Sequence, residues 1–75
     1  MKPRLQPTPR ELECLNAVAQ GMNTAEIAAL LGISNRTVDH HLANVMRKLN
    51  TRTRAESTGV AVALGLITLD LSQYL

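Results

Sequence analysis

The residues of this chain that could do chemistry gather between Ser34 and Arg54. This segment holds five basic side chains and one acidic side chain, a net charge of +4, whereas the rest of the chain has a net charge of −2. Positive charge concentrated on an otherwise nearly neutral chain is a candidate surface for a polyanion. The alternative is an ordinary solvated helix face, and charge alone does not separate the two.

The same segment contains Asp39, His40 and His41 in succession. Neighbouring residues of a helix point about 100° apart, so the two imidazoles are poorly placed to chelate one metal ion, and no cysteine or carboxylate cluster completes a site. The sequence also lacks a nucleophile–base pair and a phosphate-binding loop. It therefore predicts a binding protein rather than an enzyme, with no catalytic residues, no metal and no cofactor.

The composition predicts a small helical core built from Leu, Ile, Val and Ala, because the chain has one Tyr and neither Phe nor Trp. Its single cysteine, Cys14, excludes an internal disulfide and indicates a reducing compartment. Cys14 lies on an apolar stripe, so we interpret it as a core residue rather than a reactive thiol. No apolar run reaches the roughly 18 residues of a membrane span, and the N-terminus has no signal-peptide pattern. These features predict a cytoplasmic protein with no membrane partner.

Capping signals divide the chain into four helices. A capping residue followed three positions later by Glu begins at Thr8, Asn23 and Thr53, and Ser34 can cap the remaining helix. Asn50 is a plausible C-terminal cap of that helix. The sequence thus predicts one all-α domain over residues 1–75, a four-helix bundle. Its predicted helices span residues 9–20, 24–31, 35–49 and 54–64, followed by a tail at 66–75.

The second and third predicted helices have the features of a helix-turn-helix, a short helix joined to a longer one by a tight turn. Ala28 is small where the two helices approach each other, and Gly32 permits the positive φ of the turn. Ile33 and Val38 can fill the space beneath the turn. A generic helical hairpin is the alternative.

Residues along most of the chain, including those of the helix-turn-helix, form a wider pattern. They are Thr8-Pro9-Arg10-Glu11, Gly21, Glu26-Ile27-Ala28, Leu31, Ile33-Ser34, Thr37-Val38, His41, Asn44, Lys48-Leu49 and Arg54. The pattern resembles the signature of LuxR-type DNA-binding domains over about residues 8–67, with Pro7 and Ser57 as departures. The resemblance implies a four-helix domain, often dimeric through its fourth helix, whose third helix enters the major groove of double-stranded DNA. It also implies transcriptional control in bacteria, with a response-regulator output domain as one setting and RNA polymerase as a further candidate partner.

The third predicted helix has an apolar stripe and a polar outer face. The stripe consists of Val38, Leu42, Val45 and Leu49, and the outer face consists of Asn35, Arg36, Asp39, His40, Ala43 and Arg47. The resemblance assigns base contact to Asp39, His40 and Ala43, and Arg36 is adjacent and long enough to join them. Arg36 can pair with guanine. His40 can donate to guanine or accept from an adenine amino group, and Ala43 can touch a thymine methyl or allow close approach.

Two residues of this helix have more than one interpretation. Asp39 can accept from a cytosine amino group, or can orient Arg36 or neighbours of Ala43. Alternatively, it only favours the helix N-terminus through the macrodipole. The resemblance favours a half-buried, hydrogen-bonded structural role for His41 over base reading.

Phosphate contacts are expected from side chains around the edge of the basic surface. The candidates are Thr24, Thr37, Asn44, Lys48 and Arg52. Arg54 is either a further phosphate contact or a structural residue that pairs with an acid such as Glu11.

The fourth predicted helix has no charged residue from Ser57 to Ile67 and no polar face. One side can pack on the core and the other, formed by Ala55, Thr58, Gly59 and Val62, on a second copy as a homodimer. The alternative is a monomer whose apolar patch is covered by another domain of a longer protein. The sequence leaves open whether the chain is a free-standing regulator or the output module of a larger one. A different function remains open, a helical module whose basic face binds an acidic protein.

Overall fold

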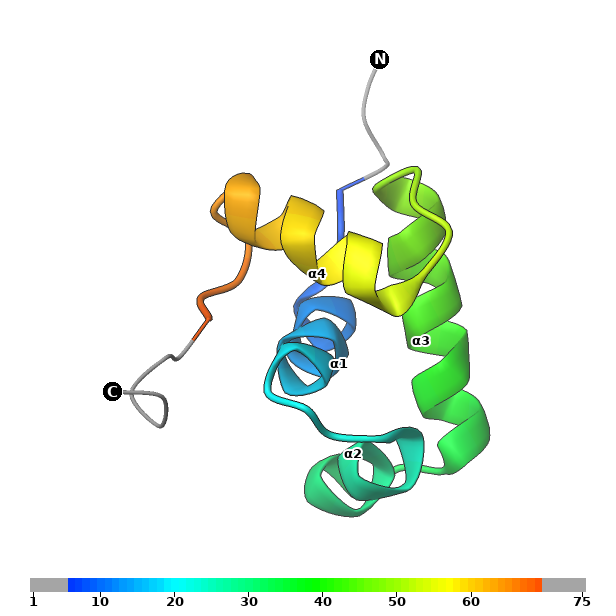
Figure 1. Cartoon of the computed structure of the whole chain (residues 1–75). Coiled ribbons are helices and arrows are strands. Elements are labelled where there is room, and N and C mark those ends of the chain that lie inside the picture. Colours follow the sequence, from blue (N-terminus) through cyan, green and yellow to red (C-terminus); the bar gives the residue numbers. More distant parts are fainter. Residues whose placement is uncertain (1–5, 70–75) are drawn as a thin grey trace, which may run out of the picture.

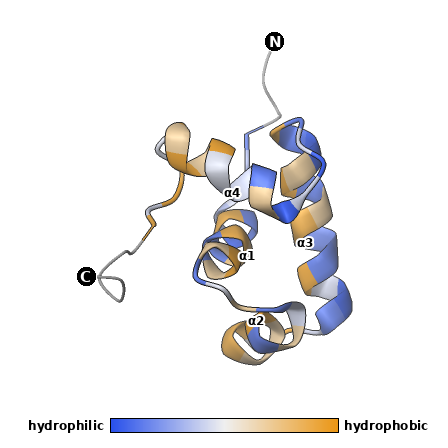
Figure 2. Cartoon of the chain, viewed as in Figure 1, coloured by the Kyte–Doolittle hydropathy of each residue, from blue (hydrophilic) through white to orange (hydrophobic). Residues whose placement is uncertain are grey.

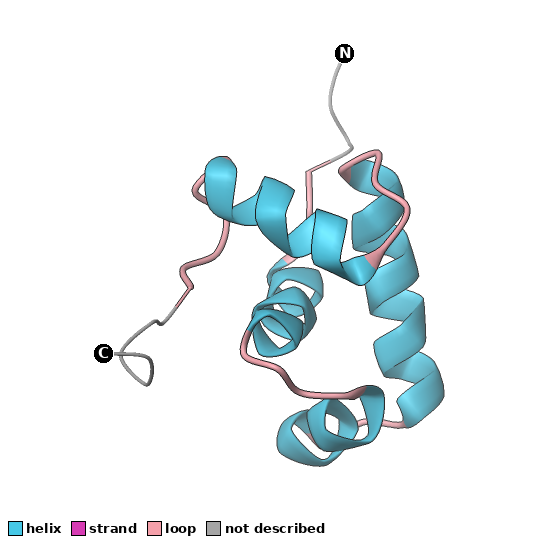
Figure 3. Ribbon diagram, viewed as in Figure 1, coloured by secondary structure: helices cyan, strands magenta, loops and turns pink. Residues whose placement is uncertain are grey.

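The computed structural model describes residues 6–69 of the chain, and residues 1–5 and 70–75 lie outside the described part. The four helices are α1 (Pro9–Ala19), α2 (Thr24–Leu31), α3 (Asn35–Lys48) and α4 (Arg54–Ala63). Figure 3 shows helices joined by loops throughout residues 6–69, which confirms the predicted all-α class. The predicted helix bounds agree with these to within one residue. The predicted tail falls mostly outside the described residues.

Local capping explains where the helices begin. In α1 and α2 the capping boxes are complete, since Thr8 and Asn23 each accept from a backbone N–H while Glu11 and Glu26 reach back to the cap. In α4 the predicted box is only half formed. Thr53 caps the helix, but the Glu56 carboxylate accepts from the backbone N–H of Arg52 at 2.8 Å.

The four helices surround one apolar core. In Figure 1, α1 lies at the centre, with α3 along one side, α2 beneath it and α4 above it. Figure 2 shows hydrophilic residues along much of α3 and more apolar ones on α1 and α2. The main buried residues are Cys14, Leu15, Ile27, Val38, Leu42, Val45, Ala61 and Ile67. The predicted inward stripe of α3 is therefore confirmed for its first three residues, and Leu49 is half-buried. Burial also raises the pKa of the Cys14 thiol, in agreement with its interpretation as a core residue.

One polar side chain is fully enclosed by this packing. Ser57, on α4, has no exposed surface. Its hydroxyl donates to the backbone carbonyl of Thr53 at 2.9 Å and also contacts the hydroxyl of Thr51. A buried hydroxyl that is hydrogen-bonded carries little penalty, so the core accommodates serine at this position.

The turn between α2 and α3 has the geometry expected of a helix-turn-helix. Gly32 ends α2 with φ +71°, and its N–H donates to the carbonyl of Ala28. The N–H of Ile33 donates to the same carbonyl at 3.1 Å. Ala28 is buried where α2 meets α3. This turn fixes the angle at which α3 leaves α2 and therefore decides which residues of α3 face outward.

Replacing Gly32 by alanine tests the turn. An alanine Cβ would meet no atom within 4 Å, so the expected cost is the left-handed backbone alone, about 1–2 kcal/mol of unfolding free energy. Gly59→Ala is the matched control. It has equal room but lies inside α4 without a positive φ, and should stabilise by about 0.5–1 kcal/mol. Thermal or urea unfolding measures both, and equal effects at the two glycines would contradict this account.

Candidate nucleic-acid interface

The outer face of α3 is the surface on which the candidate base-reading residues meet. Ser34 begins the helix, its hydroxyl accepting from the backbone N–H of Thr37 at 3.0 Å. From this start the inward stripe turns the remaining positions outward. The six residues predicted to lie on the outer face are all exposed: Asn35, Arg36, Asp39, His40, Ala43 and Arg47. The predicted face is thus confirmed, whereas contact of these residues with bases stays a prediction.

Asp39 joins three helices through its carboxylate. Its Oδ1 accepts from Arg54 Nη2 at 2.8 Å and from the Thr24 hydroxyl at 3.1 Å. Arg54 Nη1 donates to the same hydroxyl at 2.9 Å. Three hydrogen bonds therefore connect the first turn of α2, the first half of α3 and the first residue of α4. We call Thr24, Asp39 and Arg54 the three-helix clamp.

The three-helix clamp gives Asp39 and Arg54 partners that the sequence did not single out. Within residues 6–69 the carboxylate of Asp39 forms its ion pair with Arg54 and not with Arg36, because Arg54 approaches from α4. Arg54 does not pair with Glu11, whose carboxylate is engaged by Lys48. Of the two roles that the sequence leaves open for Arg54, its contacts with Asp39 and Thr24 support the structural one.

Lys48, the last residue of α3, is hydrogen-bonded to the first turn of α1 and to the segment before it. Its ammonium donates to both carboxylate oxygens of Glu11, at 2.9 and 3.1 Å, and to the backbone carbonyl of Gln6 at 3.3 Å. An ammonium group has three N–H donors. All three therefore have acceptors inside the domain, so the geometry does not favour the predicted contact of Lys48 with a phosphate.

The carboxylate of Glu11 is almost completely buried, with 4% of the residue exposed. Burial raises the pKa of Glu11, but its hydrogen bonds to Lys48 and the Thr8 backbone and the charges of Lys48 and His41 outweigh burial, so the pKa lies below its ordinary value of 4.5. His41 is half-buried, in agreement with its predicted position at the edge of the core. Neither the burial of Glu11 nor its partner was predicted from the sequence.

The other candidate phosphate residues lie around the same surface. Thr24 belongs to the three-helix clamp, and the Thr37 hydroxyl lies 2.9 Å from that of Ser34. Asn44 is hydrogen-bonded to His40 and Arg47, and Arg52 is exposed in the loop before α4. Arg47 was not among the predicted site residues. Its spacing from His40 and Asn44, seven and three residues, was the signal in the sequence that could have indicated it.

The exposed side of α4 borders a groove. Ala55, Gly59 and Val62 are exposed and Thr58 is half-buried, whereas Ser57 and Ala61 face the core. The two sides of the helix thus separate as predicted at Ser57 and Ala61, but Leu64, which helical spacing places on the side of Ser57 and Ala61, is 62% exposed. The groove has a volume of about 270 Å³ and is lined by Ala19, Thr58, Gly59, Val62 and Leu69.

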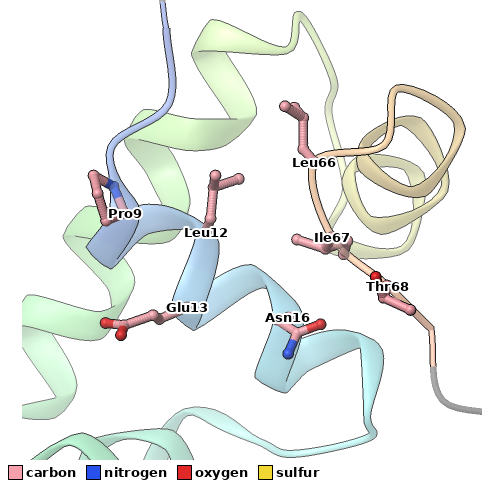
Figure 4. A pocket seen from close by; sticks show the side chains of 7 residues that line it. All are labelled: Pro9, Leu12, Glu13, Asn16, Leu66, Ile67 and Thr68. Carbon is pink, nitrogen blue, oxygen red and sulfur yellow. The ribbon is translucent and has the colours of Figure 1, made fainter.

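A second depression, of about 320 Å³, lies between α1 and the segment that follows α4. Figure 4 shows Leu12, Leu66 and Ile67 gathered around it, with Glu13 and Asn16 along α1. No residue of α3 lines it, so it does not belong to the basic surface.

Among residues 6–69, no helix has both the length and the apolar character that crossing a bilayer requires.

Comparisons with known proteins agree with this geometry. The family described as "Bacterial regulatory proteins, luxR family" matches residues 7–61. The chain is 45% identical over 60 residues to the transcriptional activator protein AnoR of Acinetobacter nosocomialis, covering 80% of this chain and 25% of that protein. It is 47% identical over 51 residues to the nitrate/nitrite response regulator protein NarP of Escherichia coli strain K12, covering 68% of this chain and 24% of that protein. The solved structure of the transcription factor GerE aligns with a TM-score of 0.81 and 31% identity, covering 91% of this chain and all of that one.

The fold and the exposed third helix define a helix-turn-helix DNA-binding domain. The chain belongs to the luxR family of bacterial regulatory proteins, a family of DNA-binding transcriptional regulators and not a class of enzymes. It spans about a quarter of the length of the curated relatives it matches.

Proposed function

We propose that this domain binds double-stranded DNA sequence-specifically, with α3 in the major groove, and regulates bacterial transcription as a homodimer. The observation that carries the proposal is the outer face of α3, where Arg36, His40 and Ala43 are all exposed on one surface. An α-helix fits the major groove, and side chains of its exposed first half reach base edges. RNA polymerase is the partner through which such binding would act on transcription.

In this proposal Arg36 reads guanine, His40 reads a neighbouring base, and Ala43 permits close approach. Thr37, Asn44 and Arg52 lie around this face and hold the phosphates. The single O–H donor of Thr24 is engaged by Asp39, so the predicted contact of its hydroxyl with a phosphate is not part of this proposal. Asp39 acts on DNA through Arg54, because its carboxylate neutralises a guanidinium that would otherwise be free to approach a phosphate.

Selection from a random duplex library tests the proposal. Wild-type protein should enrich a two-fold symmetric site. Arg36→Ala should lose about 1–3 kcal/mol of discrimination at one base position in each half-site. Arg52→Ala, which also removes one positive charge, should instead weaken all sequences alike and reduce the salt dependence by about one phosphate contact. Enrichment of no sequence, with both variants following net charge alone, would contradict base reading.

The second candidate function is binding of an acidic protein by the same basic face. Phosphate-dominated binding to DNA falls steeply with salt and is competed by duplex of the right sequence. A complex with an acidic protein that survives excess duplex of the selected sequence would favour this alternative.

Dimer formation through α4 is supported by the exposed apolar groove beside Gly59 and Val62. Val62→Lys should abolish dimers, because it places a charge in the apolar surface that the two copies would bury. Leu64→Lys is the matched control, since Leu64 is exposed to 62% but does not line the groove. Sedimentation velocity at high micromolar concentration, with and without a symmetric duplex, measures both. A wild-type protein that stays monomeric even on DNA would refute the dimer.

A further inference from the structure

Three side chains on α3 form a hydrogen-bonded line along the helix. His40 Nε2 lies 3.2 Å from Asn44 Nδ2, and Arg47 Nη1 donates to Asn44 Oδ1 at 3.1 Å. The spacings of four and three residues place all three on one face, one turn apart. His40 and Arg47 are exposed and Asn44 is half-buried, so the amide between them is the most enclosed member of the line.

The chemistry of these groups fixes the direction of both hydrogen bonds. A guanidinium group can only donate, so the atom of Asn44 that faces Arg47 is its carbonyl oxygen. The amide NH₂ of Asn44 then faces His40, and this group also can only donate. Nε2 of His40 is therefore the acceptor. In a neutral imidazole one nitrogen accepts and the other carries the proton, so the proton lies on Nδ1.

We propose that Asn44 and Arg47 are positioning residues that hold His40 in its Nδ1–H tautomer, so that α3 presents a hydrogen-bond donor and rejects cytosine at the base facing His40. This inference rests on the proposed base reading by α3. The sequence alone left His40 able either to donate or to accept. The line of hydrogen bonds selects donation.

The preference against cytosine follows from the groups that bases expose in the major groove. Guanine, adenine and thymine each offer an acceptor there, whereas cytosine offers its amino donor. A donor on His40 meets an acceptor on three bases and a second donor on cytosine. The opposite tautomer, with Nδ1 as acceptor, would instead accept from cytosine or adenine.

The first experiment measures the tautomer in the DNA-free domain. Nitrogen-15 NMR of the imidazole rings, at a pH where His40 is neutral, distinguishes Nδ1–H from Nε2–H. Imidazole side chains in water favour Nε2–H, so a dominant Nδ1–H form of His40 is expected only if Asn44 donates to Nε2. Asn44→Ala and Arg47→Met should shift His40 towards Nε2–H, whereas Arg47→Lys, which keeps a charged donor, should not. A wild-type His40 in the Nε2–H form overturns the proposal.

The second experiment measures base preference with the same variants. Selection from a random duplex library should show cytosine depleted at one position in wild type and in Arg47→Lys. Arg47→Met leaves the amide free to rotate and should relax this depletion by about two- to tenfold, the worth of one hydrogen bond. Arg52→Met controls for the lost charge and should lower affinity without changing base preference. If cytosine is depleted in Arg47→Met as strongly as in wild type, the hydrogen bonds among His40, Asn44 and Arg47 have no role in base recognition.

The two experiments separate this inference from the proposed function. If wild type selects a sequence but His40 is in the Nε2–H form, DNA reading stands and the tautomer proposal fails. If His40 is in the Nδ1–H form but no sequence is enriched, the proposed base reading fails and the recognition step fails with it.

Discussion

Replacing Lys48 with methionine is expected to lower the free energy of unfolding by about 3 kcal/mol, at the low end of the range for breaking a buried ion pair. The Lys48 side chain is exposed to only 14% and that of Glu11 to 5%, so solvent screens their attraction weakly. Methionine would leave the Glu11 carboxylate buried without its counter-charge. For a domain of this size the melting temperature should fall by roughly 12–24 °C, measured by thermal unfolding at neutral pH.

Two controls distinguish the ion pair from general effects of substitution. Glu13→Gln breaks the exposed pair of Arg10 and Glu13, whose side chains are 44% and 56% exposed, and should cost under about 0.5 kcal/mol. The double variant Glu11→Leu, Lys48→Met removes both charges and should recover much of the loss, because neither charge is then left unpaired. A double variant as unstable as the sum of its single variants would show that the charges do not interact.

The same pair gives the domain an acid-sensitive contribution to stability. The pKa of Glu11 is lower in the folded state than its ordinary value of 4.5. The unfolded chain therefore binds the proton more tightly, and this contribution is complete above the ordinary value and disappears as pH falls through the lower folded value. Glu11→Gln, which can still accept from the Thr8 backbone, should flatten the decline of unfolding free energy below about pH 4.5.

The parts of this domain that sequence predicted well are those with local causes. Helix starts depend on side chains three residues from the cap, and the outer face of α3 depends on the spacing of Val38, Leu42 and Val45. The helix starts and the outer face of α3 can each be recognised from residues within one or two helical turns. Hence the helix bounds and the exposed candidate residues agreed with the structure.

The polar contacts between helices were not predicted, because no local spacing encodes them. Lys48 meets Glu11 across 37 residues, and Arg54 meets Thr24 across 30. Such pairs depend on how α1, α3 and α4 cross, which the packing of the whole core decides. For this reason the sequence predicts Lys48 at a phosphate and leaves Asp39 open between a base, Arg36 and the helix macrodipole, without indicating Glu11 and Arg54 as their partners. The error at Glu56 is instead local, since the loop before α4 places the backbone N–H of Arg52, four residues earlier, within reach of the Glu56 carboxylate.

Replacing Asp39 with alanine is expected to raise affinity for random duplex roughly tenfold and to steepen its salt dependence by about one phosphate contact. The substitution removes a negative charge from the surface proposed to face DNA and releases Arg54 Nη2 from its 2.8 Å ion pair. Stability should change by less than about 1 kcal/mol, because the two side chains are 39% and 59% exposed. Filter binding or fluorescence anisotropy over a series of salt concentrations measures both affinity and slope.

A second substitution in the Asp39→Ala background tests whether Arg54 is responsible for the added affinity. If the gain runs through Arg54, then Arg54→Gln should abolish the added affinity and return the salt slope to that of wild type. Glu13→Gln, which also removes one negative charge but from α1, should leave the slope unchanged. A gain that persists without Arg54 would mean that the Asp39 carboxylate itself repels the phosphates of the duplex. The three-helix clamp would then be a structural contact only, and selectivity would come from Asp39 directly.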